Sequence, residues 1–491
     1  MDVMTELATG GAFNSFGSSR RQLIEASLYG MDLMEVSKAL ATSSSFGTDG
    51  SALNGYDLDA LIRYATLQRN ANTPKVRRWH TFEAKALTTE WNRLSRRGNA
   101  EGNFRNQGAL GVSDSSTLAR VTSNQKFLGR VGAVTRELQA AAGGSFGDAK
   151  AFELREQLTQ FLLNLERDIW HSDSDLNDLA WDGILKQMSS GSEFVTDLAT
   201  NTAGKITAGG ALSLATVRGV LHTPIRYAGT FSSLYCAPQE RTAFGSDSDS
   251  LTHFYKQDQM SNLGRGIKVD QIASEFNDSG IDIIWDLTLA GIRGKYLHTP
   301  EDPTDSTKFH SQAPNQLSAA LSLGVTSGGY LPDDTYYYGV AAVNEVGESP
   351  IKLFSTGQAT SSTNNTVQIT VTHGSDVANV KSYRLYRSTT NGTDYSKMRL
   401  VKEVALASAA VAGGTQVLED DGSVVPGSRQ AILMDETSCA MGALENPVVE
   451  DLPRIDGTHR FAIDAINDCI LYVPQHAHRF DNIGGSVTDP A

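Results

Sequence analysis

The chain has 491 residues, of which 40% are hydrophobic and 20% are charged, a balance typical of a folded globular protein. Its formal net charge is −14 at pH 7, which disfavours tight nucleic-acid binding, since such proteins usually have a basic face, but permits loose enclosure of DNA. No apolar run approaches the roughly 18 residues of a membrane-spanning helix, and the acidic residues 1–6 lack the layout of a signal peptide. This composition predicts a soluble protein made in the cytoplasm.

The first 147 residues divide into two stretches of different composition. Residues 1–74 are rich in Gly, Ser, Thr and Ala, with two weakly apolar helix patterns at 19–40 and 57–68 that need another surface to pack on. Residues 75–147 carry twelve lysines and arginines against five acids, which predicts a long extended arm or hairpin. On sequence alone, this stretch is either a solvated loop or an arm that clasps a partner.

The clearest helix pattern covers residues 148–170. Apolar residues recur there at three- and four-residue spacing, and Asp148 is the predicted N-cap. At about 1.5 Å per residue the helix would span roughly 30 Å or a little more. The acidic residues that follow it are Asp173, Asp175, Asp178 and Asp182.

A mixed α/β pattern follows, up to about residue 299. The predicted elements are, in chain order, a helix at 212–221, a strand at 232–236, a helix at 248–262, a strand at 267–272, a turn at 277–280 and a strand at 281–285.

Beyond the polar linker 300–305, residues 314–421 have an all-β pattern. Val367, Ile369 and Val371 alternate with polar residues, and further strands are predicted at 335–343, 381–387 and 399–404. The segments YYYGVAAVNEVGES and YRLYRS, which start at Tyr336 and Tyr383, resemble fibronectin type III or immunoglobulin-like modules. A small β-sandwich is therefore predicted, and such a fold says little about function.

The α/β pattern resumes after this module, so we interpret the module as an insertion. Residues 429–435 continue the α/β style, and two short strands are predicted at 460–463 and 470–473 with a turn between them.

No catalytic or metal-binding pattern is convincing. Ser145 lies in a GxSxG sequence, but the residues before it make a poor buried strand, so a hinge is the better interpretation. His476 and His478, with His459 upstream, lack a carboxylate or thiol in a matching pattern. The acidic run imitates the start of a calcium loop but has Ile184 where a bidentate Glu belongs. We therefore expect no cofactor, no metal and no enzymatic activity.

The cysteines Cys236, Cys439 and Cys469 lie far apart and match no CxxC motif. They are predicted to be buried free thiols, and not disulfide or zinc ligands.

In chain order, the predicted parts are an arm, a long basic loop, one long helix, a mixed α/β region, a β-module and closing strands. This order resembles the major capsid proteins of tailed bacteriophages, with the Hong Kong 97-type coat fold. Residues 75–147 resemble the family's extended loop, 152–170 followed by His171-Ser172-Asp173 its spine helix, 267–285 its axial-domain strands, and 452–483 its return to the peripheral domain. Immunoglobulin-like insertions are familiar in that family.

The resemblance implies an α+β fold with seven parts along the chain. These are an N-terminal arm (1–74), an extended loop (75–147), a peripheral domain with the spine helix (148–210), an axial domain (211–299), a linker with an inserted Ig-like β-sandwich (300–428), an axial-domain return (429–443) and a peripheral-domain return with the C-terminus (444–491).

The resemblance also implies the function of a structural shell subunit. Copies of the chain would assemble as hexamers and pentamers into an icosahedral virion head around double-stranded DNA, without sequence-specific binding and without a membrane. Scaffold, portal and cement or decoration proteins would be possible partners. We expect the basic loop to lie over a neighbour's acidic run, where opposite charges fix register. The candidate contact residues are Arg93, Arg96, Arg97, Arg105, Asp173, Asp175, Asp178 and Asp182.

Three other interpretations stay open. Encapsulin compartments have the same fold, so the fold does not by itself establish a virus. A secreted carbohydrate-binding protein or glycosidase with a fibronectin-like module would have a signal peptide and a carboxylate pair. A tail or fibre protein would show trimeric repeats or heptads, and neither pattern is found.

Overall fold

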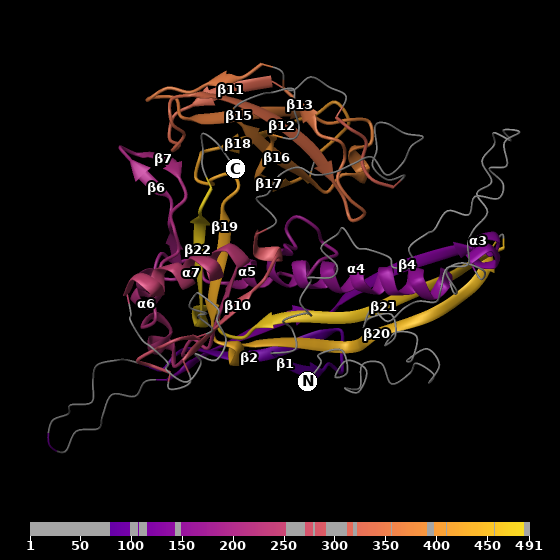
Figure 1. Ribbon diagram of the computed structural model, residues 1–491, viewed down its shortest axis with the longest axis horizontal. Coiled ribbons are helices and arrows are strands. Elements are labelled where there is room, and N and C mark those ends of the chain that lie inside the picture. Colours follow the sequence, from indigo (N-terminus) through magenta and orange to yellow (C-terminus); the bar gives the residue numbers. More distant parts are fainter. Residues whose placement is uncertain are drawn as a thin grey trace, which may run out of the picture. The chain divides into compact units, whose positions relative to one another are not determined.

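The computed structural model describes residues 79–98, 107, 115–142, 149–251, 271–277, 280–290, 312–317, 322–354, 356–389, 397–408, 410–455 and 457–485. The predicted arm 1–74, the N-cap Asp148, the motif around Ser145 and the linker 300–305 lie outside these residues. The described chain is a strand-rich α+β protein (Figure 1). It divides into two compact units, Met1–Asp168 with Ala440–Ile470 and Ile169–Cys439 with Leu471–Ala491.

The first unit is built on a four-stranded sheet in the order β1-β20-β21-β4. The long helix α4 (Ala149–His171) confirms the helix predicted at 148–170. Its Leu158 and Phe161 share a hydrophobic cluster with Phe461 of the sheet, because residues at this spacing lie on one face of a helix. The other elements are β1 (His80–Glu83), β4 (Lys126–Thr135), α3 (Arg136–Ala142), β20 (Cys439–Ile455) and β21 (Thr458–Leu471).

The prediction of two short closing strands is wrong. Residues 460–463 and 470–471 belong to one continuous strand, β21, whose pairing with β4 runs from Thr458 opposite Thr135 to Asn467 opposite Lys126. No turn residue interrupts the strand; the predicted break falls on the polar residues Asn467 and Asp468, which are buried. A turn was predicted there because the residues are polar, but burial keeps them within the strand.

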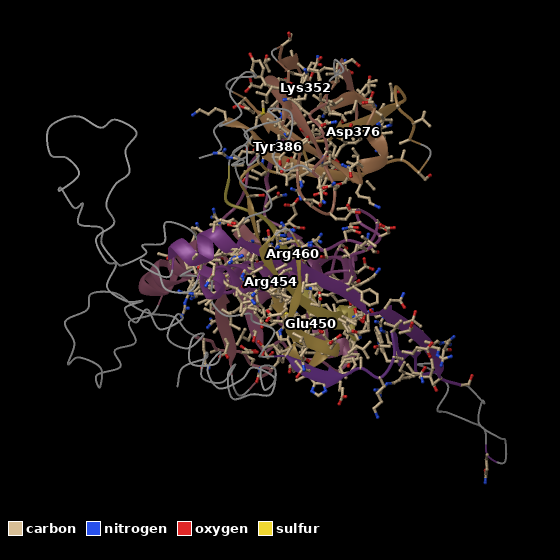
Figure 2. The ribbon with its side chains drawn as sticks, turned by 90° about the vertical axis from the view of Figure 1, so that its right-hand side faces the viewer. Lys352, Asp376, Tyr386, Glu450, Arg454 and Arg460 are labelled. Atoms are coloured by element: carbon tan, nitrogen blue, oxygen red, sulfur yellow. The ribbon has the colours of Figure 1, made fainter. Side chains whose placement is uncertain are left out.

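The long strand β20 has no counterpart among the predicted strands. Pro447 and Pro453 disfavour a central strand, because proline cannot donate to a ladder. However, β1 pairs with β20 only from Ala440 to Ala443. Beyond Ala443 one edge of β20 has no other described strand beside it, and such an edge tolerates proline. Figure 2 labels Glu450 and Arg454 on β20.

A separate hairpin in the first unit consists of β2 (Thr88–Arg96) and β3 (Thr117–Asn124). The hairpin interpretation of residues 75–147 holds for these strands. The rest of that stretch is different, since β4 belongs to the four-stranded sheet.

The second unit contains a six-stranded sheet in the order β5-β22-β19-β8-β10-β9. Leu234, Ile283, Leu433 and Phe480 from four of its strands are buried in one hydrophobic cluster. The elements around and within it are α5 (Ile184–Gln187), β5 (Val195–Asp197), β6 (Thr200–Thr202), β7 (Lys205–Ala208), α6 (Leu214–Gly219), η4 (Thr223–Tyr227), β8 (Ser233–Cys236), α7 (Pro238–Leu251), β9 (Gln271–Ile272), β10 (Ile281–Trp285), η6 (Thr288–Ala290), β19 (Arg429–Met434), η9 (Glu436–Ser438), η10 (Pro474–His476) and β22 (Ala477–Ile483).

Most predictions for this sheet are confirmed, with one correction. The strands β8 and β10 and the helix α6 lie within or on the predicted ranges. Strand β9 covers the end of the strand predicted at 267–272, and β19 lies in residues 429–435, for which only an α/β style was predicted. The helix predicted at 248–262 instead begins at Pro238, ten residues earlier. Proline suits the first turn of a helix, because the amides of that turn have no intrahelical acceptor and the missing N–H costs nothing. The carboxylate of Glu240 in the same turn interacts favourably with the positive end of the helix dipole. The polar Asp and Ser residues near Ser248 lie inside the helix and do not begin it.

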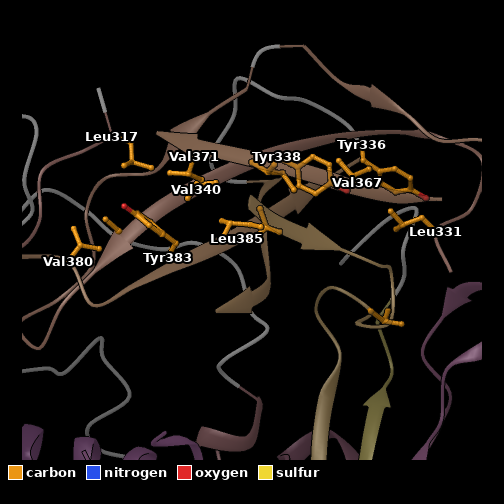
Figure 3. Close-up of a cluster of buried hydrophobic side chains, with 14 of the residues drawn as sticks. Leu317, Leu331, Tyr336, Tyr338, Val340, Val367, Val371, Val380, Tyr383 and Leu385 are labelled. Atoms are coloured by element: carbon orange, nitrogen blue, oxygen red, sulfur yellow. The ribbon is translucent and has the colours of Figure 1, made fainter. Parts of the chain in front are cut away.

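Two antiparallel sheets lie between β10 and β19 in the sequence, in the orders β11-β15-β18 and β13-β12-β16-β17. Tyr338, Val340 and Leu385 from the second sheet share a core with Val367 and Val371 from the first (Figure 3). Because β19 returns to the six-stranded sheet beside β8, this sandwich is an insertion in that sheet's sequence. Its elements are β11 (Ser322–Thr326), β12 (Thr335–Val343), β13 (Lys352–Leu353), β14 (Gln358–Ala359), β15 (Thr366–Thr372), η7 (Val377–Asn379), β16 (Ser382–Ser388), β17 (Arg399–Ala405) and β18 (Thr415–Asp420).

Asn482 of β22 links the segment that follows the last strand of the sandwich to the six-stranded sheet. Its side chain donates to Asp197 Oδ1 at 2.8 Å and to the Ser423 carbonyl at 2.9 Å, and it accepts from the Val425 amide at 3.1 Å. Its φ of 55° is in the left-handed region, which asparagine tolerates better than most residues. Ile206 of β7 adds a second attachment, since it is buried in the core of the sandwich.

Candidate assembly surfaces

The β2–β3 hairpin forms a two-stranded sheet that no other described strand joins. Its pairing runs from Thr88 opposite Asn124 to Arg96 opposite Thr117. A hairpin of two strands is only marginally stable in water by itself. This hairpin therefore needs a surface to lie on.

The side chains of the hairpin alternate between a half-buried face and an open face. Trp91 lies opposite Val121 on the half-buried face. On the open face, Leu94 lies opposite Leu118, and 45% and 62% of these two side chains are exposed. The cross-strand leucines form an apolar pair open to solvent, which is a feature of surfaces that bind a partner.

The predicted contact arginines that the structure describes all come from this hairpin and the residue after it. Arg93 is half-buried on β2, and burial lowers the pKa of its guanidinium. Arg96 and Arg97, at the end of β2, are exposed. Arg105 lies outside the described residues.

The predicted contact aspartates lie in the turn between α4 and α5, in the second unit. Hydrogen bonds to Asp175 and Asp173 raise the pKa of the Lys186 ammonium, whose Nζ lies 2.9 Å from Asp173 Oδ1. Asp182 accepts from the Ser174 amide at 3.0 Å. Local contacts thus give the turn a fixed shape, with several carboxylates gathered at the surface.

Asp178 contacts the inserted sandwich. Its Oδ1 lies 3.2 Å from Lys381 Nζ, which also lies 3.5 Å from Glu345 Oε1. The hydrogen bond to Asp178 is the main reason that the pKa of Lys381 is raised. Of the described candidate residues, the structure brings the aspartates together in one turn and the arginines together on one hairpin.

Sequence reasoning did not find Leu94, Leu118 or Lys381. The alternation of β2 and β3 could have placed the two leucines on one strand face, but their pairing depends on the hairpin register. Lys381 and Asp178 are 203 residues apart, so no local pattern links them.

The two C-terminal histidines are buried structural groups. His476 donates from Nε2 to the Tyr227 carbonyl at 2.9 Å, and its Nδ1 lies 2.5 Å from Ser438 Oγ. His478 Nε2 lies 2.9 Å from Thr196 Oγ1. Among the described residues no group of three or more His, Cys, Asp or Glu side chains could hold a metal ion, and no helix is long and apolar enough to cross a membrane. The three cysteines are buried, and none of them forms a disulfide.

Comparisons with known proteins give weak similarities over nearly the whole chain. No protein-family model and no curated protein matches. A chain from Mycobacterium phage Ogopogo matches at a TM-score of 0.44 with 11% identity over 89% of this chain and 99% of that one. The capsid of a native GTA particle gives 0.43 with 9% identity over 91% and 100%, and the holo-SrpI encapsulin complex of Synechococcus elongatus PCC 7942 gives 0.38 with 9% over 88% and 98%. At these identities no residue role is carried over to this chain.

Proposed function

We propose that this chain is a major capsid protein, a structural subunit that assembles into the icosahedral head of a tailed phage. The observation that carries the proposal is the β2–β3 hairpin, which has an open apolar pair and an arginine-rich end but no third strand among the described residues. Such an element is completed by another molecule. The chain itself offers a matching surface in its acidic turn, so the other molecule is a second copy.

The contact joins two different surfaces of the same chain, and it is therefore heterologous. Heterologous contacts close into rings when the rotation between copies permits it. Rings of six and five copies, hexamers and pentamers, are the units of an icosahedral shell. The Hong Kong 97-type layout is part of the proposal: α4 is the spine helix, β2–β3 the extended loop, the six-stranded sheet the axial domain and the sandwich an immunoglobulin-like insertion.

The net charge of −14 suits a container for DNA better than a DNA-binding protein. Like charges on shell and phosphate backbone keep the enclosed double-stranded DNA mobile. Scaffold, portal and cement proteins are further proposed partners in the virion. An encapsulin-type shell would enclose a protein cargo, so the content of purified shells separates the two functions.

The first test is negative-stain microscopy with light scattering of the purified protein, before and after Arg96→Glu and Arg97→Glu are introduced together. We expect the natural chain to form shells, or pentamers and hexamers. The double variant should stay folded by circular dichroism and lose about tenfold or more of its assembly rate, because both reversed charges face the neighbour's acidic turn. Lys402→Glu, an exposed reversal on the sandwich strand β17, is the control. Equal assembly of the double variant and the control would refute the proposed contact.

A further inference from the structure

Two exposed apolar residues each follow, in the sequence, one of the two acids that bind Lys381 of the sandwich. Leu179 follows Asp178 and is 61% exposed; Val346 follows Glu345 and is 45% exposed. The ammonium of Lys381 bridges Asp178 and Glu345, at 3.2 and 3.5 Å. We refer to these five residues as the joint patch. It draws Asp178 and Leu179 from the turn, and the other three residues from the sandwich.

The charges of the joint patch and its turn are opposite to those of the hairpin. The turn and the patch together contain five acids, Asp173, Asp175, Asp178, Asp182 and Glu345, against Lys381 and the adjacent Lys186 of α5. The described residues of the hairpin, 88–98 and 115–124, contain four arginines against the single acid Glu90. Each surface also has two exposed large apolar side chains, Leu94 with Leu118 on one and Leu179 with Val346 on the other.

We propose that the joint patch binds the β2–β3 hairpin of a second copy, so that the inserted sandwich supplies part of the contact between shell subunits. This inference rests on the proposed function. The leucine pair of the hairpin packs on Leu179 and Val346, and the exposed Arg96 and Arg97 at the end of β2 reach the surrounding acids. An apolar centre inside a charged rim is the usual anatomy of a specific protein interface.

The bridge of Lys381 suits such an exchange of partners. When an incoming arginine binds Asp178, Lys381 keeps Glu345 as its partner, so no ammonium is left unpaired. An exposed ion pair contributes only about 0–1 kcal/mol, so replacing one partner by another has a small free-energy cost. The sandwich stays attached throughout, because Ile206 and Asn482 hold it independently of Lys381.

Cysteine crosslinking tests the proposed contact directly. Subunits with Leu118→Cys are mixed with subunits carrying Val346→Cys, assembled, oxidised and run on a non-reducing gel. A disulfide requires β-carbons about 4 Å apart, so it reports this contact and not mere proximity. The three natural cysteines are buried and do not compete. Val417→Cys is the control, because Val417 is also an exposed valine of the sandwich, at 49%, but lies on β18, in the other sheet of the sandwich from β16, the strand that follows Lys381.

We expect crosslinked dimers in the Leu118→Cys with Val346→Cys shells at about tenfold or more the level of the Val417→Cys shells. Glu345→Lys should also slow assembly about tenfold, whereas Glu419→Lys, on β18, should not. Shells that form normally, with equal crosslinking at Val346 and Val417 and equal rates for the two lysine variants, would overturn this inference and leave the proposed function standing. Failure of the natural chain to form any shell, hexamer or pentamer would remove both.

Discussion

His478 illustrates how burial of a single residue makes the fold sensitive to acid. The side chain is 1% exposed on β22, and its ring centroid lies 5.0 Å from that of Phe480. Burial lowers the pKa of this imidazole from 6.5 to about 4. The unfolded chain therefore binds a proton between these pH values while the folded chain does not, so acid favours unfolding.

The sign of this effect gives a prediction for His478→Gln. The contribution of neutral His478 is complete above pH 6.5, declines as the pH falls towards 4, and amounts to about 3 kcal/mol over that range. Glutamine has no titrating group, and its amide can replace the ring nitrogen that lies 2.9 Å from Thr196 Oγ1. We expect urea denaturation of the unassembled chain to show a smaller loss of unfolding free energy between pH 7 and pH 4.5 in the variant. Equal losses in both proteins would exclude His478 as an acid-sensitive group.

Gly132 shows how one residue of a strand permits the packing of an entire element. It lies opposite Phe461 in the β4–β21 pair, and a β-carbon at Gly132 would lie 2.2 Å from the Phe461 ring. Phe461 belongs to the cluster under α4, so its ring cannot move without disturbing that helix. We expect Gly132→Ala to lower the unfolding free energy by about 1–3 kcal/mol in urea denaturation.

The adjacent Ala133 provides the control for Gly132. Its side chain is exposed and points to the opposite face of the sheet. Ala133→Ser should therefore change stability by less than about 0.5 kcal/mol. A Gly132→Ala variant as stable as Ala133→Ser would mean that Phe461 has room to shift.

The elements predicted well are those whose periodicity is local. Helix α4 and the strands β10 and β12 follow from apolar spacing within their own residues, and β10 and β12 match their predicted ranges at both ends. Strand β20 was missed, and β21 was divided into two short strands, because their burial depends on partners that are distant in sequence. Asp468 is buried, but its polarity favours a turn, and Pro447 disfavours a continuous strand. Pattern reasoning located the charged residues of the candidate contact, but not the exposed leucines between them, since exposure depends on which strand face the fold covers.

At the scale of the whole molecule, the charge distribution makes assembly depend on salt. The chain has a net charge of −14, so copies repel one another except where the arginine-rich hairpin faces an acidic surface. Salt screens both the repulsion and this attraction, but the attraction acts at the contact that orients two copies and thus controls the encounter rate. We expect assembly, followed by light scattering, to slow about tenfold or more between about 0.05 M and 0.5 M salt.

The variant with Arg96→Glu and Arg97→Glu separates the two effects of salt. Its hairpin no longer attracts the acidic turn, so only repulsion between copies remains for salt to screen. Added salt should then speed its slow assembly, or leave it unchanged, in the same light-scattering experiment. If salt slows the natural chain and the variant to the same degree, the arginines do not steer the encounter, and the apolar pair Leu94 and Leu118 alone must account for the contact.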